Sequence, residues 1–292
     1  STRSKKLVIF TGHNQGVMCV KLAYQQGLVF SGSVDTTVRV WSLAKRQCEY
    51  VLTGHTDAIL CICYDPIKGR LASGSGDTTA RLWDINNGAT LHEFTGHRLN
   101  ILCLELHKDF LFTGAKDFEI RVWSTIDGSL IHVLRSHRSD IFCLSMWNDH
   151  LISGSIDSQA VIWSVNEDDA QKIETLQGHK ADVLALKVYG DMLFTASTDR
   201  TVRQWDLTKP INEKLVRVYG GHKDAIEVIG VSEYDNLVTC SADRTIKIWS
   251  TNTGECISTL PGMEWMFSMQ VIENAIVYAS AASGKLFVYK FN

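Results

Sequence analysis

The sequence is poor in several features that would assign it to a special class of protein. It has three prolines in 292 residues, no Cys-x-x-Cys pair and no Asn-x-Ser/Thr acceptor. It has no apolar run approaching the roughly 18 residues of a membrane-spanning helix, and residues 1–6 lack the apolar core of a signal peptide. These absences argue against a disordered chain, a bilayer span and a secreted protein. We therefore expect a cytoplasmic or nuclear location.

An excess of positive charge is also missing. The formal net charge is -3 and the pI is about 6.4, so the sequence does not predict a nucleic-acid partner or an anionic membrane surface. Hydrophobic residues make up 45% of the chain, which is enough to bury a sizeable core.

An internal period organises what is present. The tryptophans Trp41, Trp83, Trp123, Trp163, Trp205 and Trp249 are separated by 42, 40, 40, 42 and 44 residues, and Tyr289 follows 40 residues after the last. Each interval holds four short runs of Val, Ile, Leu and Phe, divided by Gly, Asn and Asp turns. The period therefore predicts an all-β chain built from repeated four-stranded units.

Four polar positions recur with the tryptophan. An Asp stands six residues before each Trp, a hydroxyl stands four residues before the Asp, and a His opens the unit. The six predicted quartets are His13, Ser31, Asp35 and Trp41; His55, Ser73, Asp77 and Trp83; His97, Thr113, Asp117 and Trp123; His137, Ser153, Asp157 and Trp163; His179, Thr195, Asp199 and Trp205; and His222, Thr239, Asp243 and Trp249. A buried indole N–H needs an acceptor, a hydroxyl can accept it and bond imidazole, and a carboxylate can orient the other ring nitrogen. Six equivalent copies indicate internal bracing and not catalysis.

The period, the Gly-His openings and the closing Trp resemble the WD-repeat β-propeller family. Five openings read Gly-His, at Gly12, Gly54, Gly96, Gly178 and Gly221, and the sixth reads Ser136-His137. The resemblance implies an all-β, seven-bladed WD-repeat β-propeller, whose ring is closed by the N-terminal strand completing the last blade. We expect residues 1–292 to form one such domain, excised from a larger protein.

The seventh unit departs from the others. Counting back from Tyr289 places Met263 at the His position, Ala279 at the hydroxyl and Ser283 at the Asp. Replacing all four groups together avoids leaving a buried polar group without its partner. We therefore expect a true, though degenerate, blade.

Cysteines and arginines take repeated positions as well. Cys19, Cys61, Cys103 and Cys143 each follow a loop histidine by six residues, which predicts small apolar fillers, with no disulfide framework, metal site or cofactor. Arginines two residues before a Trp are predicted at exposed blade edges, and they are Arg39, Arg81, Arg121 and Arg203.

The resemblance implies peptide binding across the narrower face, by residues at the start of each innermost strand and just before the turn Asp. The candidate partner-binding residues are Met18, Leu60, Leu102, Lys116, Asp140, Phe142, Asp182, Leu184, Glu227, Trp265 and Met266. They form an apolar rim with an acidic sector and almost no positive charge. We expect a protein or peptide partner with an apolar anchor beside a basic residue. Alternatively, the apolar side chains pack between blades.

The sequence thus predicts a non-catalytic protein-interaction scaffold that is a subunit of a larger complex. One alternative is the substrate receptor of a ubiquitin ligase, recognising a non-phosphorylated degron. A propeller hydrolase is the alternative from another class, although no unpaired catalytic group stands out.

Overall fold

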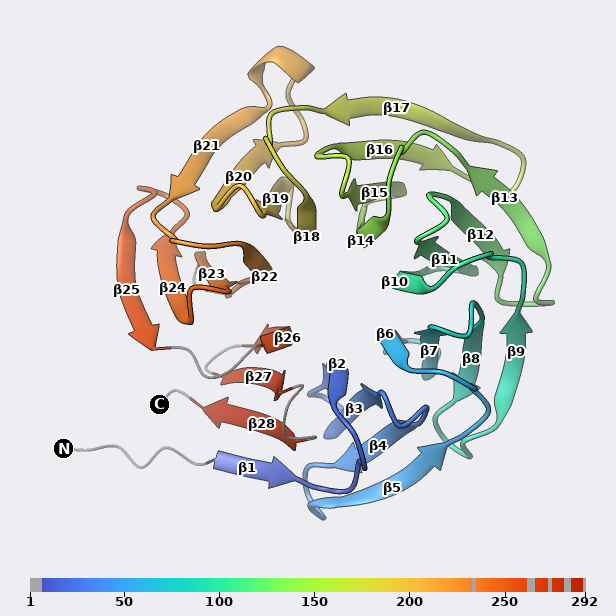
Figure 1. Cartoon of the computed structure of the whole chain (residues 1–292). Helices are drawn as coiled ribbons and strands as arrows, with labels where there is room; N and C mark the ends of the chain where they lie inside the picture. Colours follow the sequence, from blue (N-terminus) through green and yellow to red (C-terminus); the bar gives the residue numbers. More distant parts are fainter. Residues whose placement is uncertain (1–6, 233–234, 262–265, 273–274, 281–284, 291–292) are drawn as a thin grey trace. The chain divides into compact units, whose positions relative to one another are not determined.

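The chain forms two compact units in a computed structural model. The structure describes the backbone of residues 7–232, 235–261, 266–272, 275–280 and 285–290, and the side chains of residues 10–232 and 235–261. The first unit comprises Ser1–Thr113, Ser124–Ser129 and Glu264–Asn292, and the second comprises Gly114–Trp123 and Leu130–Met263. Nearly all regular structure in the described residues is β-strand (Figure 1).

Antiparallel strands that follow one another in sequence build the first unit. One sheet contains β2 (Val17–Ala23), β3 (Leu28–Ser33), β4 (Val38–Ser42) and β5 (Gln47–Leu52), and the next contains β6 (Ile59–Asp65), β7 (Arg70–Ser75), β8 (Ala80–Asp84) and β9 (Thr90–Phe94). A third has the order β1 (Leu7–Phe10), β28 (Lys285–Lys290), β27 (Ala275–Ser280), β26 (Met266–Ile272). β10 (Ile101–His107) also lies here, and β11 (Phe110–Ala115) runs to the boundary with the second unit.

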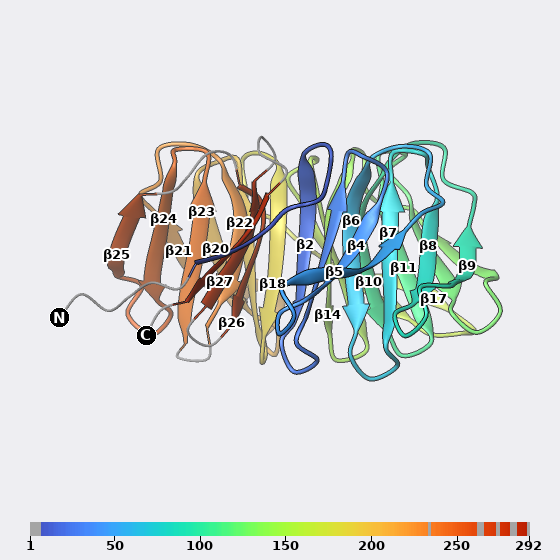
Figure 2. The same ribbon diagram turned by 90° about the horizontal axis from the view of Figure 1, so that it is seen from below.

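The second unit repeats the same plan. It begins with β12 (Ile120–Ser124) and β13 (Leu130–Leu134). Its sheets are β14 (Ile141–Trp147), β15 (His150–Ser155), β16 (Ala160–Val165), β17 (Ala170–Leu176); β18 (Val183–Tyr189), β19 (Met192–Ser197), β20 (Thr201–Asp206), β21 (Leu215–Gly220); and β22 (Ile226–Val231), β23 (Asn236–Ser241), β24 (Thr245–Ser250), β25 (Cys256–Pro261). A 3-10 turn, η1 (Ile211–Glu213), precedes β21. Seen from the side, the loops that connect the strands of a sheet lie at the two ends of those strands (Figure 2).

Small residues in the second strand of a sheet let neighbouring sheets approach closely. β6 alternates buried and half-buried residues, whereas β7 is buried from Leu71 to Ser75. A Cβ added to Gly74 would lie 2.7 Å from both Cys61 Sγ and Ile101 Cγ2 of the adjoining strands. The Ser-Gly-Ser pattern of the second strand is therefore a packing requirement.

The core lies between neighbouring sheets. Phe30 and Val40 of the β2–β5 sheet pack in one buried cluster with Ile59, Leu71 and Trp83 of the β6–β9 sheet. In the second unit a similar cluster joins the β14–β17 sheet to the β18–β21 sheet. Because a four-stranded sheet has two apolar faces, each sheet is stabilised by the next one, as repeat architectures require.

The N-terminal strand completes the sheet of the last three strands, and this prediction is confirmed. β1 pairs with β28 in antiparallel register, from Leu7 opposite Tyr289 to Phe10 opposite Leu286. Phe10 is buried and its ring centroid lies 5.5 Å from that of Trp41 in the adjoining sheet. The strand therefore removes an open sheet edge and adds to the neighbouring core.

The prediction of a seven-bladed WD-repeat propeller is corrected, because six units of the sequence keep the quartet and the last does not. Among the described residues, six four-stranded sheets have all their strands in a single unit. One of these six, the sheet that contains β1, departs from the repeat. In the other whole sheets the quartet hydroxyl stands two residues after the strand partner of the Trp. The partner of Tyr289 is Ile276, so Tyr278 and not Ala279 takes the hydroxyl position. The turn before β28 is one residue longer than in the repeats; Met263 and Ser283 lie outside the described residues.

Candidate functional site on the loop side of the sheets

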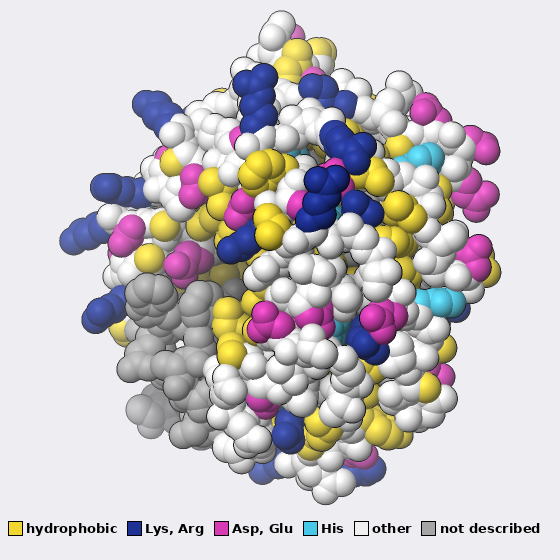
Figure 3. All heavy atoms as spheres, turned by 45° about the vertical axis from the view of Figure 1, so that its right-hand side comes forward, with side chains coloured by type: hydrophobic (Ala, Val, Ile, Leu, Met, Phe, Trp, Pro, Cys, Tyr) yellow, Lys and Arg dark blue, Asp and Glu magenta, His cyan; other side chains and the backbone are white. Residues whose placement is uncertain are grey.

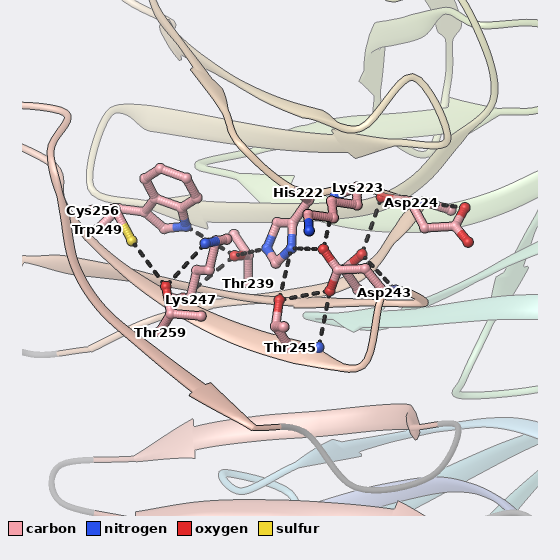
Figure 4. A network of polar contacts seen from close by, with 12 residues as sticks. His222, Lys223, Asp224, Thr239, Asp243, Thr245, Lys247, Trp249, Cys256 and Thr259 are labelled. Atoms are coloured by element: carbon pink, nitrogen blue, oxygen red, sulfur yellow. Dashed lines mark hydrogen bonds and ion pairs between the residues drawn. The ribbon is translucent and has the colours of Figure 1, made fainter.

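We call the loop side the end of each sheet at which the Gly-His loop and the Asp turn connect its strands. Figure 4 shows the quartet of the β22–β25 sheet. Trp249 Nε1–H donates to Thr239 Oγ1 at 2.9 Å, and that oxygen lies 2.8 Å from His222 Nε2. His222 Nδ1 lies 2.8 Å from Asp243 Oδ2. The carboxylate also accepts the backbone N–H of Lys223 and the hydroxyl of Thr245.

The protonation states follow from these contacts. Burial lowers the pKa of His222 below its usual 6.5, although the bond to Asp243 acts in the other direction. Burial would raise the pKa of Asp243, but bonds from Thr245, Lys223 N–H and His222 outweigh it and lower the pKa. A neutral imidazole donates from Nδ1 to the carboxylate and accepts from the hydroxyl at Nε2. The hydroxyl accepts the indole N–H, so the buried polar groups of this quartet all have partners.

The same connections recur in both units. In the first unit, hydrogen bonds join His13, Ser31, Asp35 and Trp41, and likewise His55, Ser73, Asp77 and Trp83. In the second, they join His137, Ser153, Asp157 and Trp163, and likewise His179, Thr195, Asp199 and Trp205. In the remaining quartet, His97 Nε2 lies 2.7 Å from Thr113 Oγ1. Asp117 and Trp123 belong to the other unit.

The arginines before the tryptophans explain the glycine of the Gly-His pair. The prediction of exposed blade edges is wrong, because the Arg39 guanidinium lies over the Trp41 ring, with Cζ 5.8 Å from the ring centroid, and is half-buried. Gly178 has φ +152, and a Cβ there would lie 2.6 Å from Arg203 Nη1. The backbone conformation therefore disfavours a side chain, and the guanidinium would have to move to accommodate one.

The one exception among the Gly-His openings supports this account. Ser136 replaces the glycine in the loop of the β14–β17 sheet. Two residues before Trp163 that sheet carries Val161 in place of an arginine, and Val161 is fully buried. No guanidinium stands at this position, and Ser136 lacks the positive φ of the glycines that open the other loops.

The rim residues occupy β-bulges, which the sequence did not indicate. In β2, β6, β14, β18 and β22 the pairing register skips one residue near the loop side. The skipped residues are Met18, Leu60, Phe142, Leu184 and Glu227. A bulge leaves its extra residue unpaired and redirects the side chain, as is frequent beside binding sites.

The predicted rim residues differ in how far their side chains are exposed. Phe142 is 37% exposed, and Lys116 is exposed. The half-buried members are Met18, Leu60, Leu102, Leu184, Asp140, Asp182 and Glu227. Burial, with a contribution from Asp224, raises the pKa of Glu227. Trp265 lies outside the described residues, and Met266 begins β26 with its side chain also outside them.

The expectation of a loop side with almost no positive charge is wrong. That expectation was based only on the charge of the residue before each turn Asp. The residue after the loop His and the residue after the turn Asp also lie on this side, and the exposed cations at these positions in the second unit are Arg138, Lys180, Arg200, Lys223 and Arg244. Figure 3 shows Lys and Arg side chains among acidic and apolar ones on the face that it views. Aligning these two further positions across the repeats would have found the cations.

The eight cysteines form no disulfide within the described residues. Burial raises the pKa of Cys19 to about 12, so that thiol stays protonated. No cluster of His, Cys, Asp or Glu with the makings of a metal site occurs in the part of the chain that the structure describes. The helical content of that part includes nothing long and apolar enough to cross a membrane.

Comparisons with known proteins agree with the repeat. Two proteins match short segments of the chain. A WD repeat-containing protein 89 homolog from Dictyostelium discoideum is 33% identical over 79 residues, which is 27% of this chain and 21% of that protein. A ribosome biogenesis protein BOP1 homolog from Culex quinquefasciatus is 41% identical over 70 residues, or 23% of this chain and 8% of that protein. The matched segments therefore span a small part of these relatives.

A solved structure shares the fold over the whole chain. The WD40 beta propeller domain of Doa1 superposes with a TM-score of 0.83 at 24% identity, covering 99% of this chain and 97% of that one. At this identity the likeness shows the fold alone.

The family described as "WD domain, G-beta repeat" matches residues 4–42, 46–84, 88–124, 128–164, 170–206 and 213–250. Six repeats match and none begins after residue 250, so the predicted seventh WD repeat is wrong. The physical reason is the loss of the quartet and the longer turn described above. The resemblance itself is confirmed: the chain belongs to the WD domain, G-beta repeat family.

Proposed function

We propose that this protein is a non-catalytic protein-interaction module that binds a segment of a partner on the loop side of its second unit. The carrying observation is the bulged pair Phe142 and Leu184. They stand at the same position of β14 and β18, which are neighbouring innermost strands in contact. Phe142 is 37% exposed although it is a large aromatic side chain on a rigid strand. An exposed aromatic beside a second apolar residue is a suitable anchor point for a peptide.

The quartets support a role without catalysis. Ser153 and Thr195 resemble triad hydroxyls because each lies 2.7 Å from a His Nε2 whose other nitrogen bonds an Asp. Both residues are fully buried, however, and each hydroxyl oxygen accepts an indole N–H. A substrate carbonyl cannot reach such an oxygen without opening the core.

The family and the names of its relatives support the wider proposal of a subunit in a larger cytoplasmic or nuclear assembly. Repeat surfaces of this kind offer many equivalent loops on one side of a stable scaffold. The ribosome biogenesis relatives share only about 70 residues with this chain, so they support membership of an assembly and no particular partner.

The double variant F142S/L184S tests this proposal. Peptides selected by the wild-type chain from a phage-displayed library should bind the variant at least about 30-fold more weakly, because two anchors are lost. The thermal midpoint should change little. The matched control is I173S/V216S, which removes two exposed apolar side chains from the outer strands β17 and β21. A sharp drop in stability of F142S/L184S would instead show that these residues are core, and a library that yields no binder would remove the proposal.

A further inference from the structure

Two positions on the loop side carry more cations in the second unit than in the first. The residue after the loop His is Asn14, Thr56 or Arg98 in the first unit, and Arg138, Lys180 or Lys223 in the second. The residue after the turn Asp is Thr36 or Thr78 in the first unit, and Phe118, Ser158, Arg200 or Arg244 in the second. The β18–β21 and β22–β25 sheets therefore carry a cation at both positions.

Each pair of cations flanks one carboxylate. Asp199 Oδ2 accepts the backbone N–H of Lys180 at 3.1 Å, and Arg200 is the next residue along the turn. Asp243 likewise accepts the backbone N–H of Lys223 at 2.8 Å (Figure 4). Arg244 is the next residue in the sequence. Each Asp is thus adjacent in sequence to one cationic residue and hydrogen-bonded to the backbone of the other.

The turns that carry the arginines are held by hydrogen bonds. Arg200 N–H donates to Ser197 O at 3.2 Å, and Arg244 N–H donates to Ser241 O at 3.1 Å. Both arginines have left-handed backbone conformations, with φ 70 and φ 64. Their side chains therefore start from a fixed backbone, which lowers the ordering cost of binding.

The loop side of these two sheets carries four exposed cations. Lys180, Arg200, Lys223 and Arg244 are all exposed and make no ion pair within the described residues. The Asp199 and Asp243 side chains are only 11% and 7% exposed and already bond imidazole. The other carboxylates on the loop side of these two sheets are the half-buried Asp182 and Glu227 and the exposed Asp224.

We propose that the loop side of the β18–β21 and β22–β25 sheets binds an acidic protein segment, with one carboxylate of the segment at each pair of cations. This inference rests on the proposed function and specifies the chemistry of its ligand. Discrete side-chain carboxylates can reach Lys180 with Arg200, and Lys223 with Arg244, while avoiding Asp182 and Asp224. A continuous phosphate backbone would be repelled by those two aspartates, and the chain has a net charge of -3.

The sheet spacing predicts the spacing of the acidic residues. β18 and β22 are in contact, and packed sheets lie about 10 Å apart. A segment in the polyproline II conformation advances about 3.1 Å per residue and has three residues per turn, so residues three apart point to the same side. Two carboxylates three residues apart, as in Glu-x-x-Glu, therefore match the two pairs of cations.

Fluorescence anisotropy on the full chain tests this. The probes are a Glu-x-x-Glu peptide, the same peptide with adjacent glutamates, its Gln-x-x-Gln and phosphoserine counterparts, and a single-stranded RNA of equal length. We expect the Glu-x-x-Glu peptide to bind best among the unphosphorylated peptides and to weaken with added salt. K180Q/K223Q should weaken it about tenfold. The matched control K172Q/K209Q removes two exposed lysines elsewhere in the unit and should leave the Kd unchanged.

Four results would overturn the inference: equal binding of the Gln peptide, equal loss in the control variant, preference for RNA, and binding only when phosphorylated. The failure of this inference is distinguishable from failure of the proposed function. If library peptides without acidic residues bind in a manner that depends on Phe142 and Leu184, only the ligand chemistry is wrong. If no peptide binds, both proposals fail.

Discussion

The two units share one hydrogen-bonded skeleton and differ in what they expose above it. His55 in the first unit and His222 in the second make the same bonds to a hydroxyl and an Asp, within 0.1 Å of each other. The residues next to those histidines are Thr56 and Lys223. The skeleton is repeated because every sheet must satisfy the same buried groups, whereas the loop residues face solvent and are free to vary. Specific function is therefore to be sought in the positions that differ between copies.

The largest effect is expected from breaking the shared skeleton. His55→Ala and His222→Ala should each lower the free energy of unfolding by about 1–3 kcal/mol, because a buried hydroxyl and a carboxylate lose a partner. Equal losses in the two units would show that the skeletons are equivalent. Denaturant titration measures both variants, with the exposed Lys172→Gln as a control. An unchanged midpoint in either variant would contradict a structural role for that quartet.

A smaller effect is expected from the packing of the loop glycine. Gly178→Ala should cost about 1–3 kcal/mol, because its φ of +152 and the Arg203 guanidinium both oppose a side chain. Arg203→Val, which copies the pairing of Ser136 with Val161, should recover part of that loss in the double variant. A double-mutant cycle on thermal or denaturant unfolding gives the coupling. Strict additivity would show that the guanidinium does not limit this position.

The smallest effect is expected from mild acid. Burial lowers the folded-state pKa of His13, His55 and His222 below 6.5. Their contribution to stability is therefore complete above pH 6.5 and is lost as the pH falls below it, because the unfolded chain then binds more protons. The thermal midpoint of unfolding should therefore decrease when the pH is lowered from 7.5 to 5.5.

Two further groups set the limits of that pH profile. Hydrogen bonds from Thr37, Asn14 N–H and His13 outweigh burial and lower the pKa of Asp35 from 3.8 to about 2, so a second loss begins below pH 4. Glu227 has a raised pKa, and its contribution has the opposite sign because it is lost as the pH rises. Glu227→Gln should therefore steepen the loss on acidification. A midpoint that rises toward pH 5.5 in this variant would contradict the assignment of neutral histidines.

Much of the skeleton was predictable from the sequence, because its signals are local. The spacing of Trp, Asp, hydroxyl and His predicted four strands in each unit and the polar groups that meet, as in Trp249, Thr239 and His222. The pairing of β1 with β28 was also predictable, since the last unit lacked a strand and residues 5–10 offered one. Counting residues failed in the last unit, where a single extra turn residue moved the hydroxyl position to Tyr278.

The sequence by itself determined the all-β class, the six family repeats and the members of each quartet, because a repeated buried network needs the same residues at the same spacing. Only the tertiary structure decided that Leu184 stands in a bulge and that Arg203 packs beside Gly178. It also decided that Lys180 and Arg200, 20 residues apart in sequence, flank one carboxylate. These features depend on strand register and on which segments meet across a turn, and no local pattern of residue types carries that information.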